Sequence, residues 1–334
     1  MIHICAVDGQ DQSQTYRSEW LQWPLIVCLF ILTHSTQVHA QTKKTAAAKS
    51  QDLTLSARDG WPIRITYYPA TGSQGKESPV VILLHDKGGN RLIWKRSFAR
   101  ALQLRGYAAI GVDLRKHGES RPTNGGAAIS GKTAKSSVDL KPADYNAMVA
   151  GDLEAVKKFL LKEHQAEKLN MRKTAIIAAG MTCPVALNFT ALDWLKKPYD
   201  DAPTLAAKTP RGQDVRALIL LSPEQSVSGL QPSVRAATNI RSPVYQISVL
   251  ICVSSQDKLD RGTSKKIHTQ LTSVTANKKR MLLKKYKGRW RGTDLLNKSS
   301  VKVEPLMLNF LDKYVKNLNR QRDLWRSRKN KLTN

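Results

Sequence analysis

The sequence Gly106–Ser120, GYAAIGVDLRKHGES, joins a short apolar run to a polar turn rich in charged residues. Its apolar part, Ala108–Val112, contains no polar residue, which is typical of a strand buried on both faces of a sheet. The run Val80–Leu84 (VVILL) has the same character and also ends in a polar turn, HDKGG at residues 85–89. Because such strands are almost confined to parallel sheets, the two runs predict a sheet covered by helices on both faces.

The rest of the chain continues this alternation of strand-like and helix-like segments. The dipeptide Asp59-Gly60 separates two strand-like segments, 52–56 and 63–68, and predicts an antiparallel hairpin. Further strands are expected at Thr174–Ala178, Val215–Leu221, Val249–Val253 and Met281–Leu283, and helices at Trp94–Leu104, Asp144–His164, Val185–Leu195, Thr263–Leu271 and Val301–Leu318. The expected fold class is α/β, with a mostly parallel sheet in a single domain at residues 51–318.

The first 40 residues have the pattern of a secretory signal peptide. The apolar run Leu25–Leu32 precedes the sequence Val38-His39-Ala40, after which cleavage is expected. This predicts a secreted or periplasmic (cell-envelope) protein whose linker is residues 41–50, or a membrane-anchored protein if the segment stays uncleaved. No apolar run approaches the roughly 18 residues of a membrane span, so no transmembrane domain is expected in the mature chain.

The chain is strongly basic, with 54 Lys+Arg against 26 Asp+Glu and a formal net charge of +28. Residues 1–40 hold one of these cations and three of the anions, so the chain without them would carry +30. The cations concentrate in residues 278–291 and in a basic C-terminal tail, residues 319–334, which is expected to extend the last helix. This excess favours an anionic partner.

The first of these basic segments surrounds the last expected strand. It predicts an anion-binding surface made by Lys284, Lys285, Lys287, Arg289 and Arg291. The interleaved aromatic residues Tyr286 and Trp290 would suit stacking on nucleic acid or carbohydrate. For an exported protein, we expect an anionic envelope polymer or an unidentified small molecule as the partner, and nucleic acid is the less expected one.

Three motifs together resemble the α/β-hydrolase fold superfamily, in its lidless esterase or serine aminopeptidase-like branch. Residues 106–120 match the family stretch G-Y-x-V-x-x-x-D-x-R-G-x-G-x-S, and residues 83–89 (LLHDKGG) resemble its strand followed by an H-G-x-x-G oxyanion turn. Residues 249–257 (VLICVSSQD) resemble its penultimate strand and acid-bearing loop. The resemblance spans residues 52–314 and implies a minimal cap and a scaffold for carboxylic-ester or peptide hydrolysis by a Ser-His-Asp triad.

The nucleophile motif of this family, G-x-S-x-G, is not intact here. Counting back from Val185, as family sequences of the form G-x-S-M-G-G-x-V-A-L suggest, puts Gly180 at the nucleophile position and Met181 at the following oxyanion residue. A glycine has no side chain that could attack a substrate. Two alternatives stay open, in which the nucleophile is the hydroxyl of Thr182 or the thiol of Cys183.

The acid position of the triad holds a suitable residue, but the base position does not. Asp257 follows the penultimate strand where the resemblance places the acid, with Asp260 as a neighbouring substitute. The base position, aligned on Gly292, holds Arg291. Because an arginine stays protonated at neutral pH, it cannot act as a general base.

The oxyanion turn departs from the family as well. The resemblance assigns it to His85, Asp86 and Lys87 together with Met181, and Asp86 stands where the family usually has glycine. A carboxylate there would repel the negative charge that develops in hydrolysis. The sequence therefore predicts a non-catalytic pseudoenzyme that acts in binding or as an envelope component. Active hydrolysis through Thr182 or Cys183 and polyanion binding are the alternatives.

Two further expectations concern metals, cofactors and disulfides. No Cys/His spacing of a metal site and no glycine-rich nucleotide motif is present, so neither a metal nor a cofactor is expected. Cys183 and Cys252 lie in apolar segments and are expected to be two buried thiols.

Overall fold

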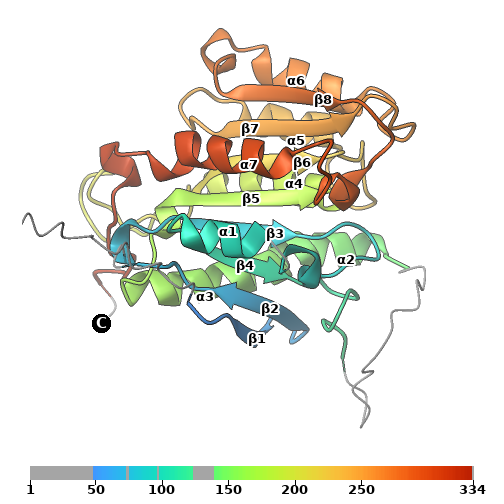
Figure 1. The fold of residues 1–334 in the computed structure, drawn as a ribbon. Coiled ribbons are helices and arrows are strands. Elements are labelled where there is room, and N and C mark those ends of the chain that lie inside the picture. Colours follow the sequence, from blue (N-terminus) through green and yellow to red (C-terminus); the bar gives the residue numbers. More distant parts are fainter. Residues whose placement is uncertain (1–47, 73–74, 96–97, 123–138, 333–334) are drawn as a thin grey trace, which may run out of the picture. The chain divides into compact units, whose positions relative to one another are not determined.

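The computed structural model describes residues 48–72, 75–95, 98–122 and 139–332 (Figure 1). The expected signal peptide and most of the expected linker lie outside these ranges. The described chain builds one eight-stranded sheet in the order β1-β2-β4-β3-β5-β6-β7-β8. Its strands are β1 (Gln51–Ser56), β2 (Pro62–Tyr68), β3 (Val80–Leu84), β4 (Ala108–Val112), β5 (Thr174–Ala179), β6 (Val215–Leu221), β7 (Ser248–Ser254) and β8 (Met281–Tyr286).

The sheet is antiparallel at its β1–β2 end and parallel elsewhere. β1 and β2 form the expected antiparallel hairpin, and β2 also pairs antiparallel with β4. All pairings from β4 through β3, β5, β6 and β7 to β8 are parallel. The inner strands β3, β4, β5, β6 and β7 are buried at every position, as their continuous apolar sequences predict.

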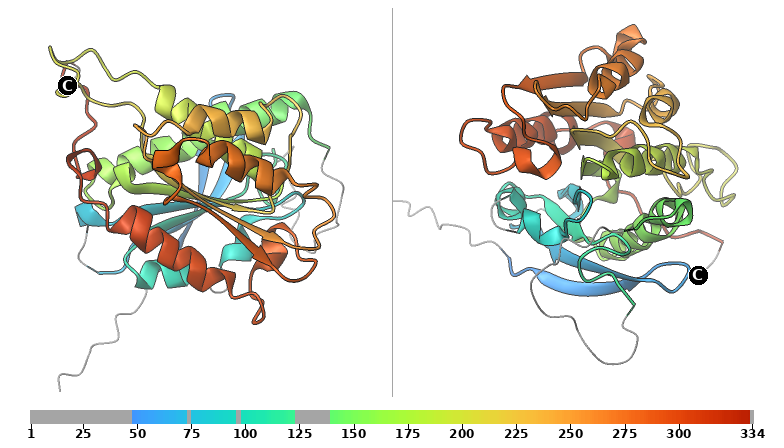
Figure 2. Two further views of the ribbon diagram at one scale, coloured as in Figure 1. Left: turned by 90° about the horizontal axis from the view of Figure 1, so that it is seen from above. Right: turned by 90° about the vertical axis from the view of Figure 1, so that its right-hand side faces the viewer.

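Helices cover both faces of the sheet, as Figure 2 shows from two further directions. One face packs against α1 (Phe98–Leu104) and α7 (Val303–Leu311), whose side chains share a core with Val81 and Leu83. The other face packs against α3 (Leu153–Gln165), α4 (Thr182–Leu195), α5 (Ser233–Ile240) and α6 (Thr263–Thr272). The α/β class with a mostly parallel sheet and two helical layers is therefore confirmed.

Several helices differ from the sequence expectations. The helix expected at Asp144–His164 is divided into α2 (Pro142–Ala147), a π turn at Met148–Asp152, and α3. α4 begins at Thr182, three residues before its expected start, directly after the turn at Gly180. α5 was not expected from the sequence, because only two helical turns separate its first residue from its last. Among the described helices, none is long and apolar enough to cross a membrane.

The prediction that the basic tail extends the last helix is wrong. α7 ends at Leu311, a π turn follows at Asp312–Lys316, and the chain then runs on irregularly apart from a short 3-10 turn, Gln321–Asp323. Arginines of this segment donate to backbone carbonyls elsewhere. Arg322 donates to Val244 O at 2.7 Å, and Arg326 donates to Ala206 O at 2.9 Å. These arginines stabilise loops of the domain, which accounts for part of the basic excess without an external partner.

Candidate functional site

The positions singled out from the sequence meet at one edge of the sheet. Asp86 follows β3, Gly180 follows β5, Asp257 follows β7 and Arg291 follows β8. Since these strands are parallel, their carboxyl ends lie at the same edge, where ligand sites of open α/β sheets form. The structure thus brings together residues that are up to 205 positions apart in the sequence.

Gly180 forms the sharp turn between β5 and α4. Its φ is +50°, in the left-handed region that disfavours side chains, and its N–H donates to Leu221 O at 2.9 Å. A Cβ atom at this position would overlap both carboxylate oxygens of Asp86. The turn therefore keeps the geometry of a nucleophile elbow, but the space for a nucleophile's side chain is filled by Asp86.

The Asp86 carboxylate is held by backbone amides. Its Oδ1 accepts from the N–H of Met181 at 3.2 Å and from the N–H of Lys87 at 2.7 Å. On the other side a Cβ at Gly292, where φ is +52°, would overlap its Oδ2. The carboxylate therefore lies between two glycines, and it accepts from the amide that would serve a hydrolase as oxyanion donor.

Arg291 and Asp257, the base and acid positions, form an ion pair. The Arg291 guanidinium lies 3.0 Å from Asp257 Oδ2, and the Asp257 side chain is 3% exposed. The second amino group of the Arg291 guanidinium, Nη2, lies 3.5 Å from Glu224 Oε1. The acid is thus neutralised by a fixed cation, in place of orienting an imidazole.

Glu224, which follows β6, is a member of the site that the sequence analysis missed. Burial, together with the nearby Asp86 carboxylate, raises the pKa of Glu224 above its ordinary value, and Arg291 only partly offsets this. The sequence does contain one signal for Glu224, because this residue comes shortly after the buried parallel strand β6, whose carboxyl end lies beside those of the other strands that carry site residues. The site therefore holds three carboxylates, two of which, Asp257 and Glu224, contact the Arg291 guanidinium.

Neither alternative nucleophile is accessible. Thr182 is fully buried, and its hydroxyl accepts from Ala179 N at 3.0 Å and donates to Ala179 O at 2.9 Å. Cys183 is also fully buried, and burial raises the pKa of its thiol well above the ordinary value. Cys183 and Cys252 are both free and buried, as expected.

His85 uses both ring nitrogens on the backbone. Its Nε2 accepts from the N–H of Leu114 at 3.2 Å, so Nδ1 carries the proton and donates to Asp86 O at 2.7 Å. Burial lowers the pKa of His85 below its ordinary value. This histidine therefore supports the oxyanion turn and has no nitrogen left to act as a base.

The predicted anion-binding surface divides into two parts. Lys284, Lys285, Lys287 and Arg289 are exposed on and after β8, the edge strand, and no carboxylate of the described residues pairs with them. Arg291 is the exception, because it is engaged by Asp257 and Glu224. Tyr286 is only 9% exposed and belongs to the core, so the suggestion that it stacks on a ligand is wrong.

In the described part of the chain, no group of three or more His, Cys, Asp or Glu side chains lies close enough together to hold a metal ion.

Comparison with solved structures finds the same fold in several hydrolases. A Pyrococcus furiosus esterase aligns with a TM-score of 0.54 at 13% identity, covering 80% of this chain and 91% of its own. A putative dienelactone hydrolase from Klebsiella pneumoniae gives the same score and identity and is covered over 99% of its length. One of two Rhizomucor miehei esterases aligns with a TM-score of 0.53 at 13% identity, covering 82% and 87%.

Comparison at the sequence level gives no relatives. No family model matches the chain, and no curated protein matches it significantly. The structural neighbours establish that the chain has the α/β-hydrolase fold, and their low identity carries nothing further about activity.

Proposed function

We propose that this protein is an exported α/β-hydrolase-fold pseudoenzyme that acts in binding or as an envelope component. The observation that carries the proposal is the Asp86 carboxylate, which accepts from the Met181 amide at 3.2 Å and fills the space beside Gly180. A hydrolase needs this amide for a substrate oxyanion and this space for a nucleophile. Both are taken by a group that carries negative charge itself.

The remaining parts of the machinery support the same conclusion. Arg291 stands at the base position and is paired with Asp257, so the side chain at that position cannot accept a proton at neutral pH. The hydroxyl of Thr182 is engaged on both sides by Ala179, and the thiol of Cys183 is buried. Active hydrolysis through either residue would require the start of α4 to open.

Ester turnover tests the loss of catalysis. The purified chain is compared with its Thr182→Val and Cys183→Ala variants, using p-nitrophenyl acetate and a longer p-nitrophenyl ester as substrates. We expect the same rate for all three folded proteins, and a rate no higher than that of the urea-unfolded chain, whose newly exposed thiols and imidazoles react non-specifically. Turnover that exceeds the unfolded control and disappears in one variant would contradict the proposal and identify the nucleophile.

Export is tested separately by the mature amino terminus. The proposal expects the chain recovered from outside the cytoplasm to begin at Gln41, after cleavage that follows Ala40. Amino-terminal peptide mapping of the fractionated producing cells gives the answer. Recovery of the intact chain only in the cytoplasm would contradict export without bearing on catalysis.

Polyanion binding is a second candidate function. The observation that favours it is the group of four exposed cations, Lys284, Lys285, Lys287 and Arg289, none of which has a carboxylate partner among the described residues. An edge strand is also commonly protected from pairing with other chains by lysines, which is the competing explanation. Retention on a heparin resin separates the two.

The test compares two triple alanine variants of equal net charge. One replaces the three lysines of the β8 segment, and the control replaces Lys141, Lys162 and Lys197, which are exposed elsewhere. Polyanion binding predicts that only the β8 variant elutes at lower salt, with a smaller salt dependence. Equal elution of both variants would assign the β8 lysines to edge protection alone.

A further inference from the structure

A basic cavity lies at the opposite edge of the sheet from Asp86 and Gly180. It has a volume of about 280 Å³ and is lined by α3, by the loop after α4 and by Arg328 of the tail. Met171 and Pro210, which precede β5 and β6, also line it, so it adjoins the amino ends of these strands. We call it the tail cavity. It shares no residue with the candidate site described above.

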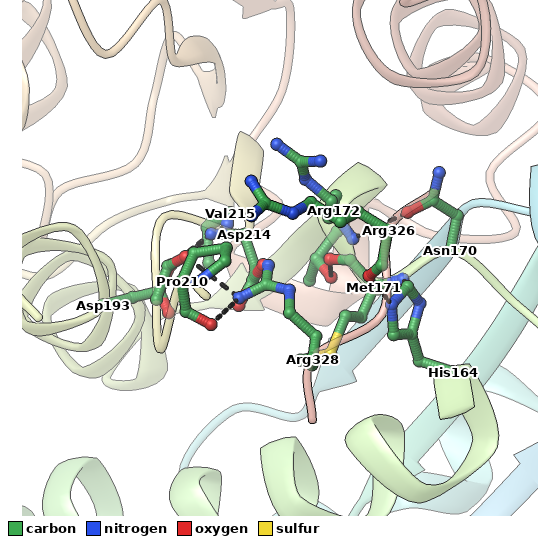
Figure 3. A network of polar contacts seen from close by, with 12 residues as sticks. His164, Asn170, Met171, Arg172, Asp193, Pro210, Asp214, Val215, Arg326 and Arg328 are labelled. Atoms are coloured by element: carbon green, nitrogen blue, oxygen red, sulfur yellow. Dashed lines mark hydrogen bonds and ion pairs between the residues drawn. The ribbon is translucent and has the colours of Figure 1, made fainter. Parts of the chain in front are cut away.

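Buried ion pairs fix the inner wall of the tail cavity. Arg328 is 5% exposed, pairs with Asp214 and donates to Pro210 O at 2.6 Å; Figure 3 shows its guanidinium beside these two residues. Lys157 pairs with Asp193 and lies 2.9 Å from Asp214 Oδ2. The Nε of Arg328 is buried without a hydrogen-bond partner in the described structure. The wall is therefore rigid and keeps one cationic donor unsatisfied.

Positive charge exceeds negative charge around the tail cavity. Five cationic side chains line it, and they face three carboxylates. Lys196 is paired with Glu154 at 2.5 Å. The two exposed cations at the opening, Lys158 and Arg211, have no carboxylate partner among the described residues. Burial and the repulsion of Lys157 lower the pKa of Lys196 despite its ion pair with Glu154. Two net positive charges thus stay uncompensated.

The rest of the lining is apolar and aromatic. Leu161 and Met171 contribute side chains of the main core, and Tyr199 stands at the opening. The guanidinium of Arg211 lies 5.1 Å from the centroid of the Tyr199 ring, so the two planar groups are positioned together. A ligand with a flat apolar body would gain contact area here, in addition to charge.

We propose that the tail cavity binds a small phosphomonoester that has an aromatic body. Two uncompensated cations match the charge of about −2 that such a phosphate carries at neutral pH. A volume of about 280 Å³ is at the lower limit of ligand pockets, which selects a small molecule over a polymer. Because the site lies at the far edge of the sheet, its occupancy does not depend on the proposed loss of catalysis.

Calorimetric titration of the purified chain with phenyl phosphate tests the proposal. The binding variant is Lys158→Ala/Arg211→Ala, which removes the two unpaired cations and leaves the buried ion pairs intact. The control is Lys162→Ala/Lys197→Ala, which removes two exposed cations outside the cavity and has the same net charge. Inorganic phosphate and benzyl alcohol are titrated as probes of the two halves of the ligand.

The expected result is binding of phenyl phosphate that weakens about tenfold in the binding variant and less than twofold in the control. Inorganic phosphate should bind more weakly than phenyl phosphate, and benzyl alcohol should not bind measurably. The proposal is overturned if phenyl phosphate does not bind at millimolar concentration or if both variants weaken alike. Equal affinity for inorganic phosphate would overturn the assignment of an aromatic body.

Discussion

Replacing Gly180 by serine tests the packing of the site directly. A side chain at this position would overlap the Asp86 carboxylate and would also stand on backbone with a φ of +50°. Overpacking of this kind costs about 1–3 kcal/mol, and the left-handed backbone costs a further ~1–2 kcal/mol. We therefore expect Gly180→Ser to lower the free energy of unfolding by about 3 kcal/mol.

The second mutation of a cycle isolates the overlap. In an Asp86→Gly background the carboxylate is gone, so Gly180→Ser should cost only the backbone strain of ~1–2 kcal/mol. The coupling energy between the two positions is then about 2 kcal/mol, measured from urea unfolding of the four proteins. Gly60→Ser is the matched control, because Gly60 also has positive φ (+78°) but no atom within 4 Å of a Cβ.

The result that would refute this reasoning is additivity. If Gly180→Ser costs the same with and without Asp86, and no more than Gly60→Ser, then the carboxylate does not fill the elbow. The double variant with serine at 180 and glycine at 86 also reinstates the family residues at both positions. It should still lack esterase activity, because Arg291 stays at the base position.

Two further predictions concern stability. Arg328→Met leaves Asp214 with only Lys157 as a partner, so we expect thermal or urea unfolding to show a loss of about 3 kcal/mol, against less than ~0.5 kcal/mol for the exposed control Lys329→Ala. A loss no larger than the control's would contradict the buried ion pair. Burial lowers the pKa of both His117 and His164 from 6.5 to about 4. The unfolded chain therefore binds more protons between these values, so stability is complete above about pH 6.5 and falls toward pH 4 by up to about 3 kcal/mol per histidine. Unfolding measured between pH 7.5 and 4.5 checks this, and His164→Gln should flatten the decline; an unchanged slope would count against it.

The strands could be predicted because burial on both faces leaves a strong signal. Runs such as Val80–Leu84 and Ala108–Val112 contain no polar residue, and the structure has strands with the same bounds. α5 could not be found in this way. It has only eight residues, and although its buried positions Ser233, Ala236, Ala237 and Ile240 have helical spacing, only Ile240 among them is a large apolar residue.

The contents of the site were predictable from the motifs, but their contacts were not. Counting from neighbouring motifs identified Gly180 and Arg291, whereas the direction of the Asp86 side chain depends on how the turns after β3 and β5 approach each other. In hindsight one signal existed. The sequence has an aspartate, Asp86, where the family has glycine, and a glycine, Gly180, where the family has serine. The larger side chain at the first position thus accompanies the missing side chain at the second.

The path of the basic tail could not be predicted from its charge, because net charge carries no information about backbone geometry. Its arginines were expected on an extended helix, but Arg322 and Arg326 bind loop carbonyls and Arg328 is buried with Asp214. The long side chain of arginine can reach such carbonyls with several donors at once. Part of the basic excess is therefore structural, and only unpaired cations such as Lys285 and Arg211 remain for external anions.

The most direct test of the central claim is covalent labelling of the purified, unmodified chain by a fluorophosphonate probe. These probes phosphonylate an activated hydroxyl at a nucleophile elbow, and the elbow of this site holds Gly180, which has no side chain. Intact-protein mass spectrometry after prolonged incubation should show the unmodified mass alone. A stoichiometric adduct mapped to Thr182 or Cys183 would contradict the claim that the site has lost its nucleophile.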